Sequence, residues 1–158
     1  MKRLTLLLFV LAFIVSCKNK NKEELVSYND KIVNIMEQAD RIMRTWNNSE
    51  IMEDYAENKS AALSKITGLQ DSLKLIVPPT SDDTLRLSGI SILNGYIQTF
   101  DIYDTIYKIL ADSVYLVEDS IRVQTLLQTN KNMVNQSSST FSEVQKRFAL
   151  RYELQFMQ

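Results

Sequence analysis

Apolar residues recur at intervals of three and four over most of this chain, and that spacing is typical of amphipathic helices. The pattern is strictest over residues 52–76, where one face carries Met52, Tyr55, Lys59, Ala62, Ile66, Leu69, Leu73 and Ile76. Only Lys59 interrupts this face, and its long stem could carry the charge to the edge of a bundle. The 158 residues include only three glycines and two prolines, so few positions interrupt a helix.

Four helices are expected. The first covers residues 23–47, with Asn29 as a polar member of its buried face. The second ends at Pro78-Pro79, because neither proline supplies an amide donor. The third covers residues 83–116 with Asp83 among its capping residues, and the fourth runs from a cap at Asp119 or Ser120 to about Tyr152, through a polar middle at 135–140. Short links force antiparallel neighbours, so the sequence predicts an all-α, up-down-up-down four-helix bundle.

Two local features of the third helix bear on its environment. Tyr96, Phe100, Tyr103 and Tyr107 form an aromatic stripe, which at this period is more often core than a ligand-stacking surface. Asp104 lies in the buried register, and Lys108 one turn later is its expected partner in a solvated ion pair.

The first seventeen residues have the layout of a secretory signal. Lys2 and Arg3 precede an apolar run from Leu4 to Val15, and Ser16 precedes the sole cysteine, Cys17. The run has 12 residues, whereas a transmembrane helix needs about 20. The segment is therefore expected to be addressed to a membrane without spanning it permanently.

Ile14-Val15-Ser16-Cys17 resembles the bacterial lipobox. The resemblance implies a diacylglycerol thioether on Cys17, cleavage before it and acylation of the new amino terminus. Two or more acyl chains give stable anchoring, whereas one holds a protein only marginally. The alternative is an ordinary signal peptide with an incidental cysteine. The expected organisation is a signal peptide at 1–16, a lipidated cysteine with a polar tether at 17–24, and a helical domain at 25–158.

Two further resemblances concern location. The run KNKNKEE at 18–24 resembles the surface-export signal of Bacteroidota lipoproteins, although a solvated linker explains it equally well. The opening Tyr28-Asn29-Asp30-Lys31-Ile32-Val33 and the close Phe148-Ala149-x-x-Tyr152 resemble a family of helical bacterial surface lipoproteins without assigned function. These resemblances imply a lipid-anchored protein of the cell envelope, at the periplasmic or surface face of the outer membrane, and no chemistry.

Composition narrows the function classes. The chain has no histidine, which removes imidazole bases, Ser-His-Asp triads and the commonest metal ligand. Without Lys2 and Arg3 it has 16 basic and 19 acidic residues, a net charge of −3, so it lacks the basic patch that nucleic acid requires. We expect that the chain is not an enzyme and that it has no catalytic residue, metal or cofactor.

The bundle geometry predicts a surface for a partner. With Cys17 in lipid, the turns near Trp46 and Tyr115 lie at the far end, and Trp46, Tyr115, Leu116 and Val117 could form an apolar patch for an envelope protein or a glycan. The alternative is that these residues cap the core. An interaction or structural module is the favoured function. A small-ligand carrier with a cavity near Ala61, Ala62, Asn135 and Ser137 is the second hypothesis, and an enzyme is a distant third.

Five of the ten aspartates are followed by a hydroxyl residue and then an aliphatic one. This triplet resembles the O-glycosylation acceptor on exported proteins of Bacteroidota, which implies candidate sites at Ser72, Thr105 and Ser113. The same residues also serve as helix caps, and capping is the favoured interpretation for the triplets that begin at Asp83 and Asp119.

Overall fold

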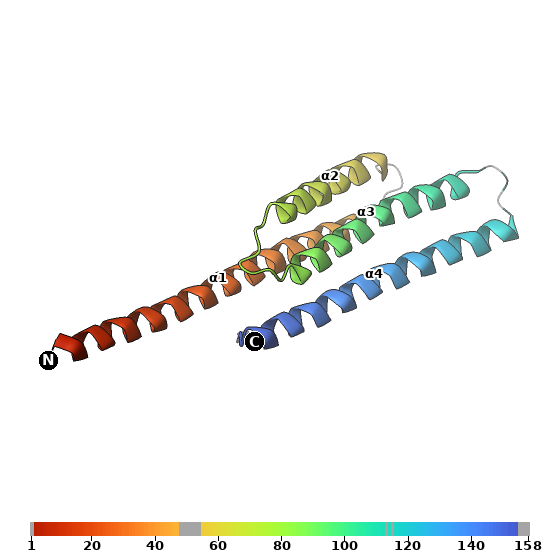
Figure 1. Ribbon diagram of the computed structural model, residues 1–158. Coiled ribbons are helices and arrows are strands. Elements are labelled where there is room, and N and C mark those ends of the chain that lie inside the picture. The colour runs from red at the N-terminus through yellow and green to blue at the C-terminus, as the bar shows by residue number, and fades with distance from the viewer. Residues whose placement is uncertain (1, 48–54, 113, 115, 155–158) are drawn as a thin grey trace.

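The computed structural model describes residues 2–47, 55–112, 114 and 116–154, and these form four α-helices and no strand. They are α1 (Lys2–Asn47), α2 (Tyr55–Lys74), α3 (Thr84–Leu110) and α4 (Val117–Arg151). Each helix runs antiparallel to the one before it (Figure 1). The prediction of an all-α, up-down-up-down bundle is confirmed.

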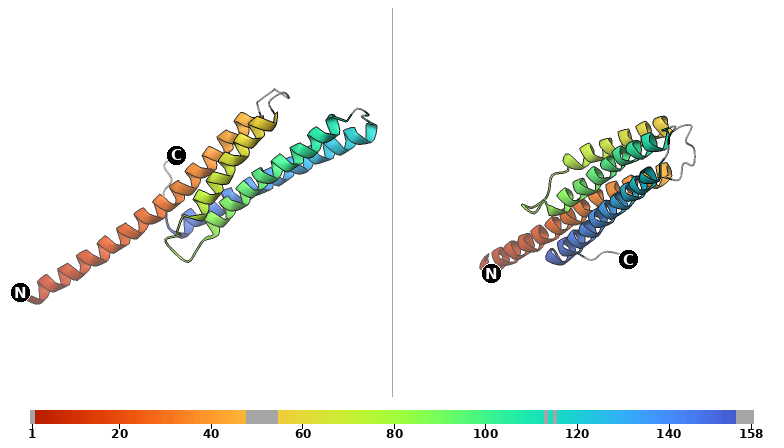
Figure 2. Two further views of the ribbon diagram at one scale, coloured as in Figure 1. Left: turned by 90° about the horizontal axis from the view of Figure 1, so that it is seen from above. Right: turned by 90° about the vertical axis from the view of Figure 1, so that its right-hand side faces the viewer.

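Helix α1 is longer than predicted, because residues 2–22 continue the helix expected at 23–47. The run at 18–24 contains no Gly or Pro, and its Lys and Glu residues have good helix propensity, so nothing breaks the helix at the expected tether. The N-terminal part of α1 extends beyond the other three helices (Figures 1 and 2). Within the described ranges, no helix has a stretch long and apolar enough to cross a bilayer.

The core lies between all four helices. Its largest fully buried side chains come from α1, α2 and α3 and are Ile32, Ile66, Leu73, Leu85, Leu93 and Phe100. Helix α4 adds Val144 and Phe148 from its C-terminal half, and the Phe148 ring lies 5.7 Å from that of Tyr28 on α1. Asn29 is buried as predicted, and its side-chain oxygen accepts a 3.3 Å hydrogen bond from Gln145 of α4. The polar middle of α4 is helical, also as predicted.

The link between α3 and α4 begins earlier than predicted, because α3 ends at Leu110 and not at residue 116. The Asp112 carboxylate accepts a 3.2 Å hydrogen bond from the Val114 amide, which is turn geometry. Helix α4 begins at Val117, so Asp119 is its third residue and not its N-cap. The Asp119 carboxylate reaches back to the Leu116 amide at 3.0 Å, which is the returning half of a capping box.

Candidate functional site

The hairpin of α3 and α4 extends past the other two helices. Helix α1 ends at Asn47, whose side-chain oxygen accepts a 3.4 Å hydrogen bond from the Tyr103 hydroxyl. Helix α2 begins at Tyr55, whose ring stacks on that of Tyr107 with centroids 4.8 Å apart. Beyond this level α3 and α4 continue as a pair (Figure 2, left). We call the described part of residues 108–121 the distal tip.

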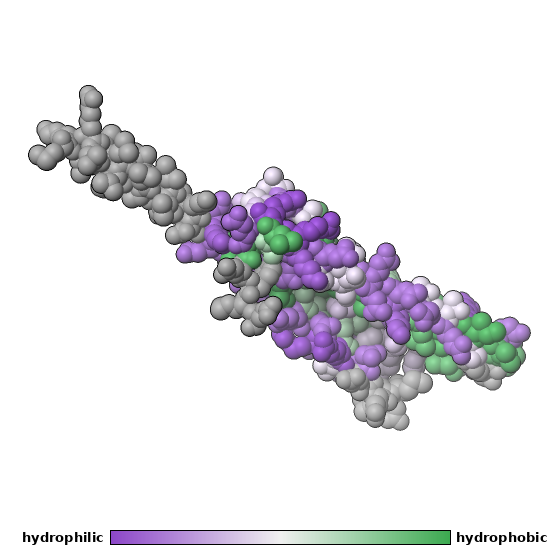
Figure 3. All heavy atoms as spheres, turned by 90° about the horizontal axis from the view of Figure 1, so that it is seen from below, coloured by the Kyte–Doolittle hydropathy of each residue, from purple (hydrophilic) through white to green (hydrophobic). Residues whose placement is uncertain are grey.

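Aliphatic side chains gather on the distal tip. The exposed fractions are 45% for Leu110, 63% for Val114, 54% for Leu116, 74% for Val117 and 60% for Ile121. Figure 3 shows apolar surface at the end of the molecule opposite the extended N-terminal part of α1. We call these five residues the distal aliphatic patch. Two helices share only one seam, so their remaining faces have no third helix to cover them.

The base of the distal tip has buried side chains that are separate from the main core. Ile106 and Ile109 are buried, yet they lie outside the main core cluster. The segment from Lys108 to Arg122 carries two basic and three acidic residues, a net charge of −1. The patch is therefore dominated by apolar surface and not by a strong field of one sign.

The predicted patch was wrong about Trp46. Its side chain is 8% exposed, and its ring makes edge contacts with Phe100 at 4.7 Å and Tyr103 at 5.0 Å. The aromatic stripe of α3 faces the end of α1, so the indole belongs to the core cluster, and for Trp46 the alternative that it caps the core is confirmed. Tyr115 lies outside the described residues, whereas Leu116 and Val117 are exposed as the prediction requires.

A polar cluster fixes α2 to α3 just below the distal tip. The Asp104 carboxylate accepts a hydrogen bond from the Tyr55 hydroxyl at 3.1 Å and pairs with Lys59 of α2. The predicted partner, Lys108, was wrong, because Lys59 reaches Asp104 across the interface between the helices. Burial alone would raise the pKa of Asp104, but the hydrogen bonds from Lys59 and Tyr55, with the positive charges of Lys59 and Lys108, lower the pKa overall. Burial and Asp104 together raise the pKa of Tyr55 well above its usual range.

The residues proposed to surround a ligand cavity do not converge. Ala61 and Ala62 line an open hollow of about 270 Å³ between α1 and α2, with Trp46 at its edge. Asn135 lines a different hollow of about 290 Å³ between α1, α3 and α4. The Ser137 hydroxyl lies opposite Gly95, where an added Cβ would be 3.8 Å away. These hollows open at the surface and do not form one shared interior cavity.

Two of the candidate glycosylation hydroxyls are bonded within their own helices. Ser72 donates to the Gly68 carbonyl at 2.8 Å, and Thr105 donates to the Asp101 carbonyl at 3.0 Å. Both bonds reach back four residues, which is a common role for Ser and Thr within helices. Ser113 lies outside the described residues. Glycosylation at these positions stays a prediction, which the intact mass of protein from its own host would test.

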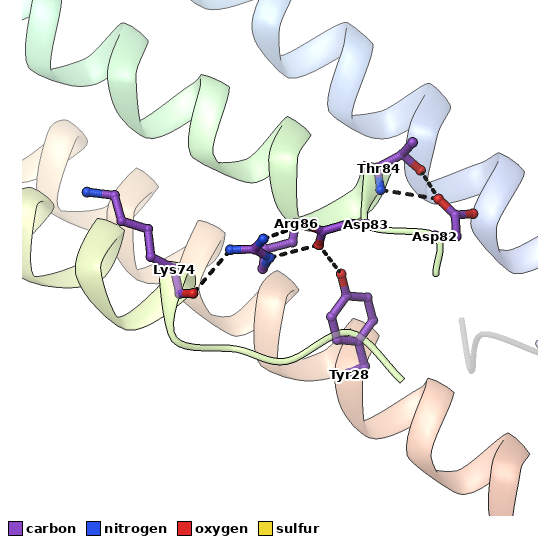
Figure 4. A network of polar contacts seen from close by, with 6 residues as sticks. All are labelled: Tyr28, Lys74, Asp82, Asp83, Thr84 and Arg86. Atoms are coloured by element: carbon purple, nitrogen blue, oxygen red, sulfur yellow. Dashed lines mark hydrogen bonds and ion pairs between the residues drawn. The ribbon is translucent and has the colours of Figure 1, made fainter. Parts of the chain in front are cut away.

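At the opposite end of the bundle, a polar network joins the link between α2 and α3 to α1 (Figure 4). Asp83 occupies the N-cap position of α3 as predicted, but its carboxylate makes no capping hydrogen bond. It accepts from Arg86 at 2.8 Å and from the Tyr28 hydroxyl at 3.4 Å, while Asp82 accepts from the Thr84 amide at 3.2 Å. Burial, with Asp83 nearby, raises the pKa of Tyr28 to about 12.

This network marks the proximal end of the bundle, from which the N-terminal part of α1 extends. Cys17 lies in that part of α1.

No group of three or more acidic, histidine or cysteine side chains in the described part of the chain could hold a metal ion. Comparison of the chain with protein-family models, curated proteins and solved structures finds no match.

Proposed function

We propose that this protein is a lipoprotein of the bacterial cell envelope, anchored through Cys17 in the outer membrane, whose helical bundle presents the distal aliphatic patch to a partner protein. The anchor rests on the signal-like N-terminus and on the likeness of Ile14-Val15-Ser16-Cys17 to a lipobox. Helix α1 connects that segment to the bundle without a break, so Cys17 and the distal tip lie at opposite ends of the molecule.

The exposure of the distal aliphatic patch is the observation that carries this proposal. Solvated helices of a monomer seldom leave neighbouring Val, Leu and Ile side chains uncovered, and larger patches of this kind mark interaction sites. The described members are aliphatic, and Trp46 is buried. Aliphatic side chains pack well against apolar protein surface, so a partner protein with such a surface fits the described part of this patch.

A site-specific crosslinking experiment in the native host tests the proposal. A photoreactive amino acid at position 117 should give one defined adduct, and Ile121→Asp should abolish that adduct because it places a charge in the same patch. Ile121 is 60% exposed, so this substitution should change stability by no more than about 0.5 kcal/mol.

Leu87 provides the matched control position, because it is a 54% exposed aliphatic residue on the N-terminal half of α3, away from the distal tip. An adduct that forms equally from positions 87 and 117, or that survives Ile121→Asp, would exclude a specific distal site. Membrane fractionation of Cys17→Ala tests the anchor separately, since the variant should leave the membrane fraction.

A further inference from the structure

The proximal end carries the most exposed large aliphatic side chains in the described part of the chain. Leu75 and Val77, on the link between α2 and α3, are each 82% exposed, and Leu150, in the last turn of α4, is 80% exposed. We propose that this end of the bundle rests on the lipid surface, with these three side chains entering the interfacial layer. The inference rests on the proposed lipid anchor and adds a second, non-covalent membrane contact.

The position of the link along α1 places it near the anchor. An open hollow of about 720 Å³ is lined by α1 residues from Glu23 to Lys31 and by link residues from Leu75 to Pro79, so the two segments lie at the same level. Cys17 precedes Glu23 by six residues, which is about 9 Å of helix. The interfacial layer of one leaflet is about 5–8 Å thick. Lys31, at the far side of the same hollow, lies fourteen residues or about 21 Å of helix from Cys17, so the bundle must lean towards the membrane for Leu75 and Val77 to enter that layer.

Four residues of the link, Leu75, Ile76, Pro78 and Pro79, leave no amide hydrogen unpaired, which suits an apolar environment. The Leu75 amide bonds to the carbonyls of Asp71 and Ser72 at 3.3 Å, and the Ile76 amide bonds to that of Leu73 at 3.2 Å. Pro78 and Pro79 have no amide hydrogen. Since unsatisfied backbone groups are costly next to lipid, this arrangement lowers the cost of burying the link.

Polar contacts hold the link in place from three sides. Arg86 binds the Lys74 carbonyl at 3.1 Å and ties the end of α2 to the start of α3 (Figure 4). The hydroxyls of Thr80 and Tyr152 lie 3.1 Å apart, and Arg151 pairs with Asp82. These contacts bring the end of α4, and with it Leu150, to the same end of the bundle as the link.

The position of Leu75, Val77 and Leu150 favours the lipid surface as what covers these three side chains. A tethered bundle meets its own membrane at a high effective concentration, so even a small apolar area can remain in contact with it. The distal aliphatic patch is held at the far end by the same geometry and does not share this advantage.

The test uses the full lipidated chain in vesicles of phosphatidylethanolamine and phosphatidylglycerol. Cys17 is the only cysteine, so after its lipidation Val77→Cys supplies a single thiol for the environment-sensitive fluorophore NBD. We expect a blue-shifted NBD emission at position 77 and strong quenching by nitroxide-labelled lipids. The matched control is Val117→Cys, at a 74% exposed valine of the distal tip, which should show neither effect. Equal emission and quenching at positions 77 and 117 would overturn the inference.

Two further measurements separate the contact from the anchor. Vesicle flotation tests the anchor. If the chain floats but the emission of NBD at position 77 indicates contact with water, only the proposed lipid contact is refuted. If the chain does not float, both proposals are refuted. A label introduced by Leu150→Cys should lose much of its lipid quenching when Val77→Asp is added, because both positions are held by the same contact. Unchanged quenching in that double variant would show that the two positions do not act as one surface.

Discussion

Trp46→Ala is the substitution that best separates a core role from a surface role. The Trp46 side chain is 8% exposed, and its ring lies against Phe100, Tyr103 and Tyr55. Removing a buried Trp side chain costs about 3–5 kcal/mol through lost transfer free energy and the cavity left behind. In a chain of 158 residues this corresponds to a decrease in Tm of about 6–20 °C.

Urea unfolding followed by circular dichroism would measure this loss on the full chain in a mild detergent. Trp46→Phe is the control, because it keeps a ring against Phe100 and should lose less than about 2 kcal/mol. If Trp46→Ala changed the free energy of unfolding by under about 1 kcal/mol, as a surface site does, the buried position of the indole would be refuted. Crosslinking from position 117 should persist in Trp46→Phe, since the indole lies outside the distal aliphatic patch.

Four further substitutions test local features of the packing. Asp104→Asn should lower the free energy of unfolding by about 1–3 kcal/mol at neutral pH, because it leaves Lys59 half-buried without its carboxylate. Since the folded pKa of Asp104 is lowered, its contribution is present above the unfolded pKa and is lost as pH falls through the folded value, so the two chains should converge in acid denaturation scans. The folded pKa of Tyr28 is raised to about 12, so its contribution to stability is complete below the unfolded pKa and is lost as pH rises through about 12. Tyrosinate absorbance of the parent chain and of Tyr28→Phe should show that Tyr28 ionises only when the chain unfolds in alkali. Ionisation of Tyr28 at the usual pKa of tyrosine would contradict the reasoning. Gly68→Ala should stabilise the chain by about 0.5–1 kcal/mol in thermal melts, because nothing lies within 4 Å of the added Cβ. Gly89→Ala should gain less, because its Cβ would lie 3.1 Å from the Leu73 side chain, and a larger gain there would contradict the packing.

The number and direction of the helices could be predicted from periodicity because the core is built from the same residues that set the pattern. Ile66 and Leu73 on α2 and Phe100 on α3 belong to the predicted faces, and all three are fully buried. Lys59 and Asp104 each interrupted a buried face, and they proved to be partners. Which acid pairs with which base depends on the register between two helices, and a pattern along one helix cannot supply that register.

The distal aliphatic patch could be predicted only in part. Leu116 and Val117 were expected. Periodicity places Leu110, Val114 and Ile121 on faces that a regular bundle would bury, and that prediction was wrong because all three are exposed. The exposure follows from helix lengths that only the structure gives, since α2 has 20 residues and α3 has 27. Seven additional residues extend α3 by about 10 Å, and α2 does not cover this end of the hairpin.

The same difference in length links the two proposed contacts. Helix α4 runs the whole way from the distal tip to the proximal end, and its 35 residues span about 52 Å. With Leu75, Val77 and Leu150 at the lipid surface, the distal aliphatic patch would stand about 50 Å above the membrane. Because the continuous α1 and the polar contacts of the proximal link leave little freedom between anchor and bundle, the partner would be met at that height. Inserting a flexible glycine and serine segment after Glu24 should therefore leave Cys17 anchoring intact while weakening the crosslink from position 117, and an unchanged crosslink would show that the height of the patch is unimportant.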